Sequence, residues 1–391
     1  MSLLREEIFS QAWPTKPLGE IVEFLDNLRK PVKSSDRIEG PYNYYGANGL
    51  QGTIDDFLFD EPLVLLAEDG GHFGNPERDI AYIAEGKYWV NNHAHVLKPH
   101  EGLDLRFLYR VLQKYDVSKY IKGATRAKLT KGDAAVMPIP IPPLAEQKRI
   151  AAILDKADAI RRKRQQAIQL ADEFLRAVFL HMFGDVEGQG WKITTIEDIA
   201  ENRKGSIRTG PFGSQLLHSE FVEKGISVLG IDNAVENTFK WGKPRFISEE
   251  KYEQLKRYTV KPGDVLITIM GTCGRCAVVP DDIPVSINTK HLCCITVDKM
   301  KCLPHFLHAY YLYHPLSKIY LNKTTKGAIM DGLNMGVIKK MPFPMVPVSM
   351  QKKYERISLK VSRSMENLLS VSHEVSDLFS SLSQKAFKGE L

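Results

Sequence analysis

The chain contains the stretch Met137-Pro-Ile-Pro-Ile-Pro-Pro-Leu-Ala-Glu-Gln-Lys148 and, 204 positions later, the related stretch Met341-Pro-Phe-Pro-Met-Val-Pro-Val-Ser-Met-Gln-Lys352. The match runs without a gap over residues 123–183 and 327–387. Within it, 10 of the 26 positions from Gly123 to Lys148 are identical in the second copy, far more than unrelated sequences share. An internal repeat determines the architecture of a chain, so this chain is a tandem of two similar units.

The repeat continues upstream with gaps. Residues 13–21, which begin at a Trp, are answered by residues 191–199 at an offset of 178, and Asn92-His-Ala-His95 is answered by Asn288-Thr-Lys-His291. The smaller offset upstream places extra length inside the second unit. The two units therefore share their edges and differ in their middles, which indicates one task applied to two different targets.

Bulk properties indicate a folded protein that works inside the cell. The 391 residues, 43% hydrophobic and 26% charged, are enough for two or three domains. No apolar run approaches 18 residues, so we expect no membrane span. The N-terminus lacks the long apolar core of a secretion signal, and an odd number of cysteines, 5, argues against a disulfide framework. We expect a cytoplasmic location, and the net charge of +6 permits a polyanionic partner.

A long helix is predicted after each Pro-rich strip. Residues 137–143 and 341–347 should be extended, because Pro fixes φ and disfavours helix in the preceding residue. No Gly or Pro then occurs until Gly184 and Gly389, which allows helices about 60 Å long. Their apolar residues follow a heptad. The predicted contact positions are Ile150, Ile153, Ala157, Ile160, Arg164, Ala167, Ala171, Phe174 and Val178, and then Tyr354, Ile357, Val361, Ser364, Leu368, Val371, Val375, Leu378 and Leu382.

These helices predict the fold class, α+β. Two similar α/β domains would be separated by an antiparallel coiled coil of the two long helices, in a dumbbell with approximate two-fold symmetry. We expect domain 1 at residues 1–143, spacer helix 1 at 144–190, domain 2 at 191–347 and spacer helix 2 at 348–391. Two alternatives are that each helix packs on its own globular unit, and that the contact positions mediate oligomerisation.

Motifs for catalysis or metal binding are weak. The chain has no G-x-x-x-x-G-K-[ST], no G-x-G-x-x-G after a strand and no Asn/Asp-Pro-Pro-aromatic tetrapeptide. A nuclease-like pattern, Asp79 with Glu85 and Lys87, is more simply a solvated turn. Cys273 and Cys276 have zinc-ligand spacing, but adjacent Cys293-Cys294 on a strand would point in opposite directions, which favours buried free thiols. His95 and His291 are expected to satisfy buried hydrogen bonds. We expect no catalytic, cofactor-binding or metal-binding residue in this chain.

Basic and polar residues are the remaining functional signal, and they suggest DNA. Just before the shared Gly-Ala, both units carry Lys-x-x-Lys, which suits phosphate contacts. The divergent interiors would supply Asn, Gln and Arg side chains that pair with base edges. Plain surface is the alternative for each residue. The candidates in the first unit are Lys119, Lys122, Arg126, Lys128, Tyr44, Asn48 and Arg78. Those in the second unit are Arg203, Arg208, Ser214, Gln215, Lys240, Lys323 and Lys326.

The order of these features resembles the specificity subunit of type I restriction–modification systems. The residues that carry the resemblance are Pro138 to Gln147, the helix endings Met182-Phe-Gly-Asp185 and Ala386-Phe-Lys-Gly-Glu-Leu391, and the repetition of the whole pattern. The second copy departs from the family pattern at Val346, Val348, Ser349 and Met350. The resemblance covers nearly the whole chain.

This resemblance implies a subunit that is not itself catalytic. Each unit would read one half of a bipartite double-stranded DNA sequence, and the two helices would fix the separation of the halves. Partners would be two methylation subunits and two restriction subunits, with S-adenosylmethionine, ATP and Mg bound there. The helices, including Arg161-Arg-Lys-Arg164, are candidate docking surface, with a solvated face as the alternative. Two other functions compete with this one. The first is a stand-alone bipartite DNA-binding scaffold. The second is an autonomous nuclease, which would require a metal-binding carboxylate cluster that the sequence does not supply.

Overall fold

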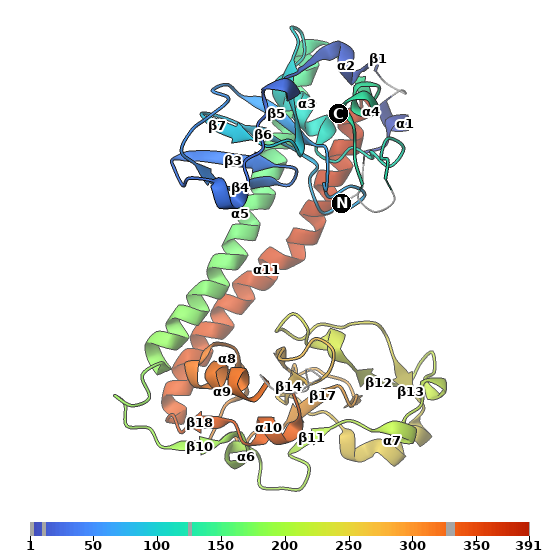
Figure 1. Ribbon diagram of the computed structural model, residues 1–391. Helices are drawn as coiled ribbons and strands as arrows, with labels where there is room; N and C mark the ends of the chain where they lie inside the picture. The colour runs from blue at the N-terminus through green and yellow to red at the C-terminus, as the bar shows by residue number, and fades with distance from the viewer. Residues whose placement is uncertain (1–3, 10–12, 124–126, 326–332, 391) are drawn as a thin grey trace. The chain divides into compact units, whose positions relative to one another are not determined.

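The computed structural model describes residues 4–9, 13–123, 127–325 and 333–390, which form two compact units (Figure 1). Unit 1 comprises residues 1–167 and 368–391, and unit 2 comprises residues 168–367. Each unit therefore contains one globular domain together with part of each long helix. Among the described helices, none combines the length and the apolar character that a membrane crossing requires.

Two main sheets form the domain of unit 1. The first has four antiparallel strands in the order β2-β8-β5-β6, and the second has three strands in the order β4-β3-β7, with β3 and β7 parallel. Strand β5, Leu63–Ala67, is buried along its whole length, as its continuous apolar sequence requires. The other strands are β2 Val22–Phe24, β3 Tyr42–Gly46, β4 Gly49–Ile54, β6 Ala81–Ala84, β7 Tyr88–Val90 and β8 Ala94–Pro99.

Short helices and a two-stranded ribbon complete unit 1. The ribbon pairs β1, Thr15–Pro17, with β9, Pro138–Pro140, so the first Pro-rich strip is extended as predicted. Helix α3 begins at Asp104, whose carboxylate accepts the Phe107 amide at 2.9 Å. The helices are α1 Glu6–Phe9, α2 Leu18–Ile21, α3 Leu105–Leu112, α4 Lys131–Ala135 and α5 Leu144–Phe183, with 3-10 turns η1 Asp26–Leu28 and η2 Ser34–Asp36.

Unit 2 repeats this topology strand for strand. Its four-stranded sheet has the order β11-β17-β14-β15, its three-stranded sheet the order β13-β12-β16 with β12 and β16 parallel, and its ribbon pairs β10 with β18. The tandem repeat predicted from the sequence is therefore confirmed. The strands are β10 Ile193–Thr195, β11 Ile207–Thr209, β12 Ile226–Leu229, β13 Phe246–Ile247, β14 Val265–Thr268, β15 Cys276–Val278, β16 Ser286–Asn288, β17 Leu292–Ile295 and β18 Pro342–Pro344.

The extra length of unit 2 lies in two connections. Residues 230–245 join β12 to β13, where unit 1 has only Ala47 and Asn48 between β3 and β4. A second insertion, residues 248–264, carries a helix between β13 and β14. The helices are α6 Ile196–Ile199, α7 Glu249–Leu255, α8 Pro304–Tyr313, α9 Pro315–Thr325, α10 Met335–Lys339 and α11 Val348–Phe387, with 3-10 turns η3 Gly213–Gln215, η4 His218–Glu220, η5 Ile231–Asn233 and η6 Lys256–Tyr258.

A buried glutamine at the start of each long helix explains one of the repeated residues. The Gln147 carboxamide oxygen accepts the Asp104 amide at 2.8 Å, and its nitrogen donates to the carbonyls of Gly102 and Pro142 at 3.1 and 2.9 Å. Gln351 makes the equivalent bonds in unit 2, with Leu303 N–H at 2.8 Å and with the carbonyls of Lys301 and Val346 at 3.0 and 2.8 Å. Each glutamine thus ties its long helix to the start of α3 or α8.

The two long helices pack antiparallel within each unit. In unit 1, Ile150 and Leu154 near the start of α5 share a core with Phe379 and Phe387 near the end of α11, and the Phe387 ring contacts Phe107 of α3. In unit 2, Phe179 and Phe183 near the end of α5 contact Tyr354 near the start of α11. The predicted pairing is confirmed, and each helix also packs on the domains, so the two packing modes coexist.

The predicted register of the helix contacts is wrong at two of the nine positions predicted in α5. Ile160 and Phe174 are 51% and 52% exposed, whereas the other seven positions are not exposed and the neighbouring Leu175 is buried. A second set of α5 positions with heptad spacing is free of exposed residues throughout: Gln147, Ile150, Leu154, Ala157, Arg161, Arg164, Ile168, Ala171, Leu175, Val178 and Met182. Adding 204 gives their counterparts in α11, of which Gln351, Tyr354, Ser358, Val361, Met365, Phe379, Leu382 and Ala386 are likewise not exposed.

In α11, the predicted contact residues Ser364 and Leu378 are exposed, and the side chains of Leu368, Val371 and Val375 lie outside the described residues. A polar residue of α5 is also buried, although hydrophobicity gives no signal for it. Asp158 lies 3.3 Å from Arg110 of α3 and 2.8 Å from Arg161 on the same helix.

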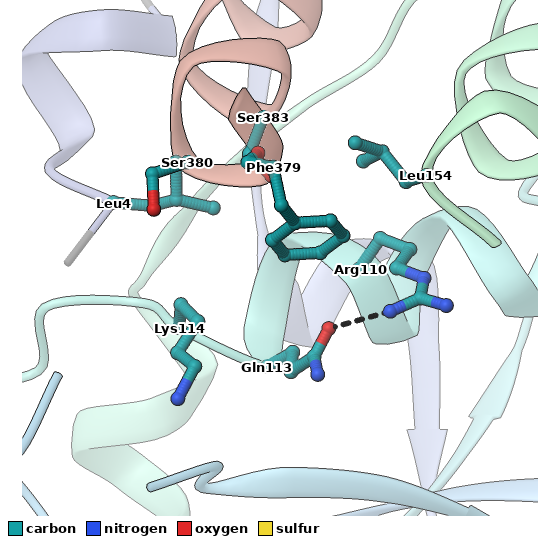
Figure 2. A pocket seen from close by; sticks show the side chains of 8 residues that line it. All are labelled: Leu4, Arg110, Gln113, Lys114, Leu154, Phe379, Ser380 and Ser383. Carbon is teal, nitrogen blue, oxygen red and sulfur yellow. Dashed lines mark hydrogen bonds between the residues drawn. The ribbon is translucent and has the colours of Figure 1, made fainter. Parts of the chain in front are cut away.

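Figure 2 shows the junction of α3, α5 and α11 in unit 1 from close by. Arg110 donates to Gln113 at 2.9 Å, drawn as a dashed line, and the Phe379 ring of α11 lies beside Arg110, whose guanidinium carbon is 6.0 Å from the ring centroid. Arg110 also donates to Asp155 of α5 at 2.6 Å. The narrow pocket here is bordered by residues already engaged in packing and ion pairs, so it belongs to the helix–domain junction.

The cysteines are free thiols, and all but Cys273 are buried. Adjacent Cys293 and Cys294 belong to different core clusters, as expected for successive residues of a strand. Burial raises the pKa of Cys293 to about 12 and that of Cys276 well above its ordinary value. The thiols of Cys276 on β15 and Cys293 on β17 are therefore protonated groups of the core.

Candidate nucleic-acid interface

In unit 1, four loops meet at one end of the sheets. We name this surface rim 1 and define it by residues 47–48, 68–80, 91–93 and the described residues of 122–128. The Asn48 side chain donates to the Gly70 carbonyl at 3.0 Å, and the Gly70 amide donates to Ala127 at 3.4 Å. Lys122 and Lys128 exchange backbone hydrogen bonds of 2.9 and 3.0 Å. The fold thus brings four predicted DNA contacts, Asn48, Arg78, Lys122 and Lys128, into one surface.

A buried polar network supports rim 1 from below. His95 Nδ1 lies 2.6 Å from the Asp26 carboxylate, and Nε2 lies 2.9 Å from the Leu129 carbonyl. Both neighbours offer oxygen atoms, so the ring bridges the Asp26 carboxylate and the Leu129 carbonyl. Burial alone would raise the pKa of Asp26, but the hydrogen bond and charge of His95 hold it below its ordinary value. His95 therefore fastens Leu129, and with it the chain that follows Lys128.

The carboxylates of Asp26 and Glu68 lie close enough to His95 to suggest a metal site. Protein cations already occupy them, since Arg29 contacts Glu68 at 2.7 Å and Asp26 at 3.4 Å, and Lys128 contacts Glu68 at 3.2 Å. The chemistry is that of an ion-pair network that holds rim 1 together.

The remaining candidates of unit 1 differ in accessibility. Arg78 is exposed in the loop between β5 and β6. Lys119 and Lys122 are exposed and ion-paired with Glu7 at 3.0 Å and Asp133 at 2.6 Å. Such surface pairs are weak and exchange readily for phosphate. Tyr44, by contrast, is 1% exposed beneath Arg37, with its hydroxyl bound to the Val32 backbone. Its ring cannot reach a base, and Arg126 lies outside the described residues.

Unit 2 has a corresponding surface, rim 2, formed by residues 210–215, 230–245, 269–275 and 289–291. Gly210 approaches the β16–β17 turn so closely that a Cβ would lie 1.9 Å from the Asn288 carbonyl oxygen. The Thr289 amide donates to Leu229 at 2.8 Å, and Gly271 lies against Ile231. Cations outnumber acids here: Lys240, Lys243, Arg245, Arg275 and Lys290 stand against Asp232 and Glu236.

Three predicted residues of unit 2, Ser214, Gln215 and Lys240, lie on rim 2, and Arg208 does not. Ser214 and Gln215 are exposed, and the Gln215 side-chain oxygen accepts the Tyr258 hydroxyl at 2.8 Å. Arg208 is only 7% exposed, because its guanidinium pairs with buried Asp264 at 2.6 Å. We therefore leave Arg208 and, for the same reason, Tyr44 of unit 1 out of the interface proposed below.

Of the other basic candidates of unit 2, Arg203 lies away from rim 2, Lys323 lies on α9, Lys240 lies on rim 2, and Lys326 lies outside the described residues. Arg203 pairs with Glu201 and donates to Thr296, which follows β17 at the end of the sheet opposite rim 2. Lys323 is exposed on α9, and Lys326 lies outside the described residues. Lys240, on rim 2, pairs with Glu236.

One sequence match between the units needs correction. The sequence repeat predicts that His95 of unit 1 corresponds to His291 of unit 2. The strand pairing shows instead that His95 corresponds to Cys293. His95 pairs with Leu66 of β5, and Cys293 pairs with Ile267, the equivalent residue of β14. The true counterpart of His291 is His93. A gapped alignment of four residues could not resolve this shift of two positions, because both histidines fit the same short pattern.

Comparisons with known proteins identify the fold and the class. The family model of the type I restriction modification DNA specificity domain matches residues 11–170 and again residues 188–365. A Haemophilus influenzae protein described as a type I restriction enzyme specificity subunit is 30% identical over 341 residues, which cover 86% of this chain and 84% of the relative. The EcoBI specificity subunit of Escherichia coli is 26% identical over 73% of this chain and 65% of its own length.

A solved structure agrees with the sequence relatives. The crystal structure of a type I restriction–modification S subunit from M. genitalium has a TM-score of 0.65 at 16% identity, with 99% of both chains covered. It shows that the fold is shared. The two family matches together span most of the chain, which therefore belongs to the family of type I restriction–modification DNA specificity proteins. As a specificity subunit, the chain supplies recognition of DNA and not catalysis.

Proposed function

We propose that each unit binds one half of a bipartite, asymmetric double-stranded DNA target through its rim. The target-recognition domains would be residues 1–143 and 191–347, and the helical segments residues 144–190 and 348–391. One observation carries the proposal: the units share their strand order, but the loops of their rims differ. Unit 1 has Ala47 and Asn48 where unit 2 has residues 230–245. Different loops on equal frames should read different half-sites.

The rims have the chemistry that DNA binding needs. The excess of cations on rim 2 suits the phosphate backbone, which supplies affinity without sequence information. Exposed amides and hydroxyls, such as Asn48 on rim 1 and Gln215 and Ser214 on rim 2, can form hydrogen bonds with base edges. Lys122 and Lys128 would exchange their present carboxylate partners for phosphates.

The helices would hold partner subunits. Helix α5 carries the exposed apolar side chains Ile160, Leu170 and Phe174, which suit contact with another protein, beside the basic segment 161–164. By likeness to the family, the partners would be two methylation subunits, which bind S-adenosylmethionine, and two restriction subunits, which use ATP and Mg. The assembly would work in the cytoplasm. A stand-alone DNA-binding scaffold is the alternative, and a neighbouring methyltransferase gene would argue against it.

Single-molecule modification sequencing tests this proposal. DNA would be taken from cells that express the chain with its neighbouring methyltransferase, and we expect a split adenine-methylated motif with a fixed gap. Exchanging residues 13–143 for those of a relative should change one half of the motif and leave the other half intact. Deleting the chain is the control and should abolish methylation. A change in both halves after the exchange would contradict the assignment of one half-site to each unit.

A further inference from the structure

A histidine stands at the same structural position in both rims. His93 ends the connection from β7 to β8, and His291 ends the connection from β16 to β17. The backbone carbonyl of each accepts the amide of the residue that follows the central strand, Glu68 in unit 1 and Ile269 in unit 2, at 2.9 Å in both cases. The two histidines are therefore equivalent, although the loops around them differ.

Each histidine is presented by a turn that an asparagine fixes. In unit 1 the Asn91 side-chain oxygen accepts the His93 amide at 2.8 Å, and in unit 2 the Asn288 side chain donates to Leu292 across the turn at 3.0 Å. The residues that follow the histidines, Ala94 and Leu292, are buried. The histidine side chains are only partly buried, with 36% of the His93 side chain exposed. A partly exposed ring on a fixed turn is placed to meet a ligand.

The surroundings of the two rings differ in charge. His93 Nδ1 lies 3.4 Å from the Asp69 carboxylate. Burial lowers the pKa of His291, and the nearby charges of Lys290 and Arg245 lower it further. A neutral imidazole carries one donor and one acceptor, which suits a base edge, while the adjacent Lys290 and Arg245 suit phosphates. On rim 2, His291 is therefore a candidate for contact with a base, and Lys290 and Arg245 are candidates for contact with the DNA backbone.

We propose that His93 and His291 each hydrogen-bond a base edge in the half-site bound by their own unit, so that the repeat supplies one matched specificity residue to each half. This proposal rests on the function proposed above. Loss of a single hydrogen bond to a base should weaken binding roughly three- to tenfold. It should also relax discrimination at one or two base pairs and leave the other half-site unaffected.

The test uses the full-length chain with its methylation partner and a duplex that carries the motif found by sequencing. Binding of wild type, His93→Ala and His291→Ala would be measured on the motif and on duplexes with one base pair changed at a time. The matched controls are His100→Ala and His305→Ala. His100 follows β8 and His305 lies on α8 with Asp281 nearby, both at the ends of the sheets opposite the rims. Thermal unfolding would verify that each variant is folded.

We expect His291→Ala to flatten the preference at one or two positions of one half-site, and His93→Ala to do so in the other half-site. The control variants should keep the wild-type profile. Equal loss on all duplexes would overturn the proposal, since it would mean phosphate contact, and so would an unchanged profile. If the wild-type complex itself shows no sequence preference, the function proposed above fails instead, so the two failures are distinguishable. Should an Ala variant fail to fold, His93→Leu or His291→Leu repeats the measurement, since a Leu side chain cannot hydrogen-bond a base.

Discussion

Replacing Gln147 or Gln351 should destabilise the contact between a long helix and the domain in one unit and leave the other unit unchanged. Gln147→Met keeps the volume of the side chain but removes its three hydrogen bonds. The Asp104 amide and the carbonyls of Gly102 and Pro142 then lose their partner. At about 1 kcal/mol of net stability per hydrogen bond, the loss is roughly 3 kcal/mol. Because 1.4 kcal/mol is a factor of ten, local opening at the start of α3 should increase on the order of a hundredfold.

Native-state hydrogen exchange read by mass spectrometry measures this opening. In Gln147→Met, amides of residues 104–108 should exchange faster by that factor while residues 303–307 keep wild-type rates. Gln351→Met should give the reverse pattern, because Gln351 bonds Leu303 and the carbonyls of Lys301 and Val346. An increase below about threefold, or an equal increase at both sites in one variant, would refute the view that each glutamine fastens its own helix start.

Two further changes probe the core of unit 2. Arg208→Met leaves the Asp264 carboxylate buried without its cation, and removing one partner of a buried pair costs about 3–5 kcal/mol. Urea denaturation should show this loss, and the double variant with Asp264→Leu should recover much of it; no recovery would mean that the pair is not the cause. Thiol labelling at pH 8 should modify Cys273 quickly in the native protein and all 5 cysteines only after unfolding, since burial raises the pKa of Cys293 to about 12. Rapid native labelling of Cys293 would contradict its burial.

Much of the architecture was predictable because local patterns carry it. Prolines at 138, 140 and 143 favour an extended strip, and the following run without Gly or Pro, with its heptad pattern, favours one long helix, which ends at Phe183. The repeat made the second copy equally clear. Hydrophobicity did not predict every helix contact, because α5 buries Asp158 and exposes Ile160 and Phe174. The Asp158 carboxylate pairs with Arg110, which is far away in sequence, so its burial depends on the tertiary structure.

The candidate interface was predictable only in part, for a related reason. Asn48, Lys122 and Lys128 are far apart in sequence, and residue type alone suggested each of them; their meeting on rim 1 depends on backbone contacts through Gly70 and Ala127. Residue type also suggested Arg208, which the fold buries against Asp264. An arginine that pairs with a carboxylate inside the protein has the same sequence signal as one that pairs with DNA.

The internal repeat and the heptad pattern are enough to show that the protein is built twice, that each half ends in a long helix, and that the halves have different interiors. These properties follow from residue identity and local periodicity, which can be read along the chain. Which residues meet depends on contacts between distant segments. The tertiary structure equates His93, and not His95, with His291, because strand pairing fixes register through hydrogen bonds between distant segments. The surfaces proposed to read DNA depend on that pairing, which no single stretch of sequence encodes.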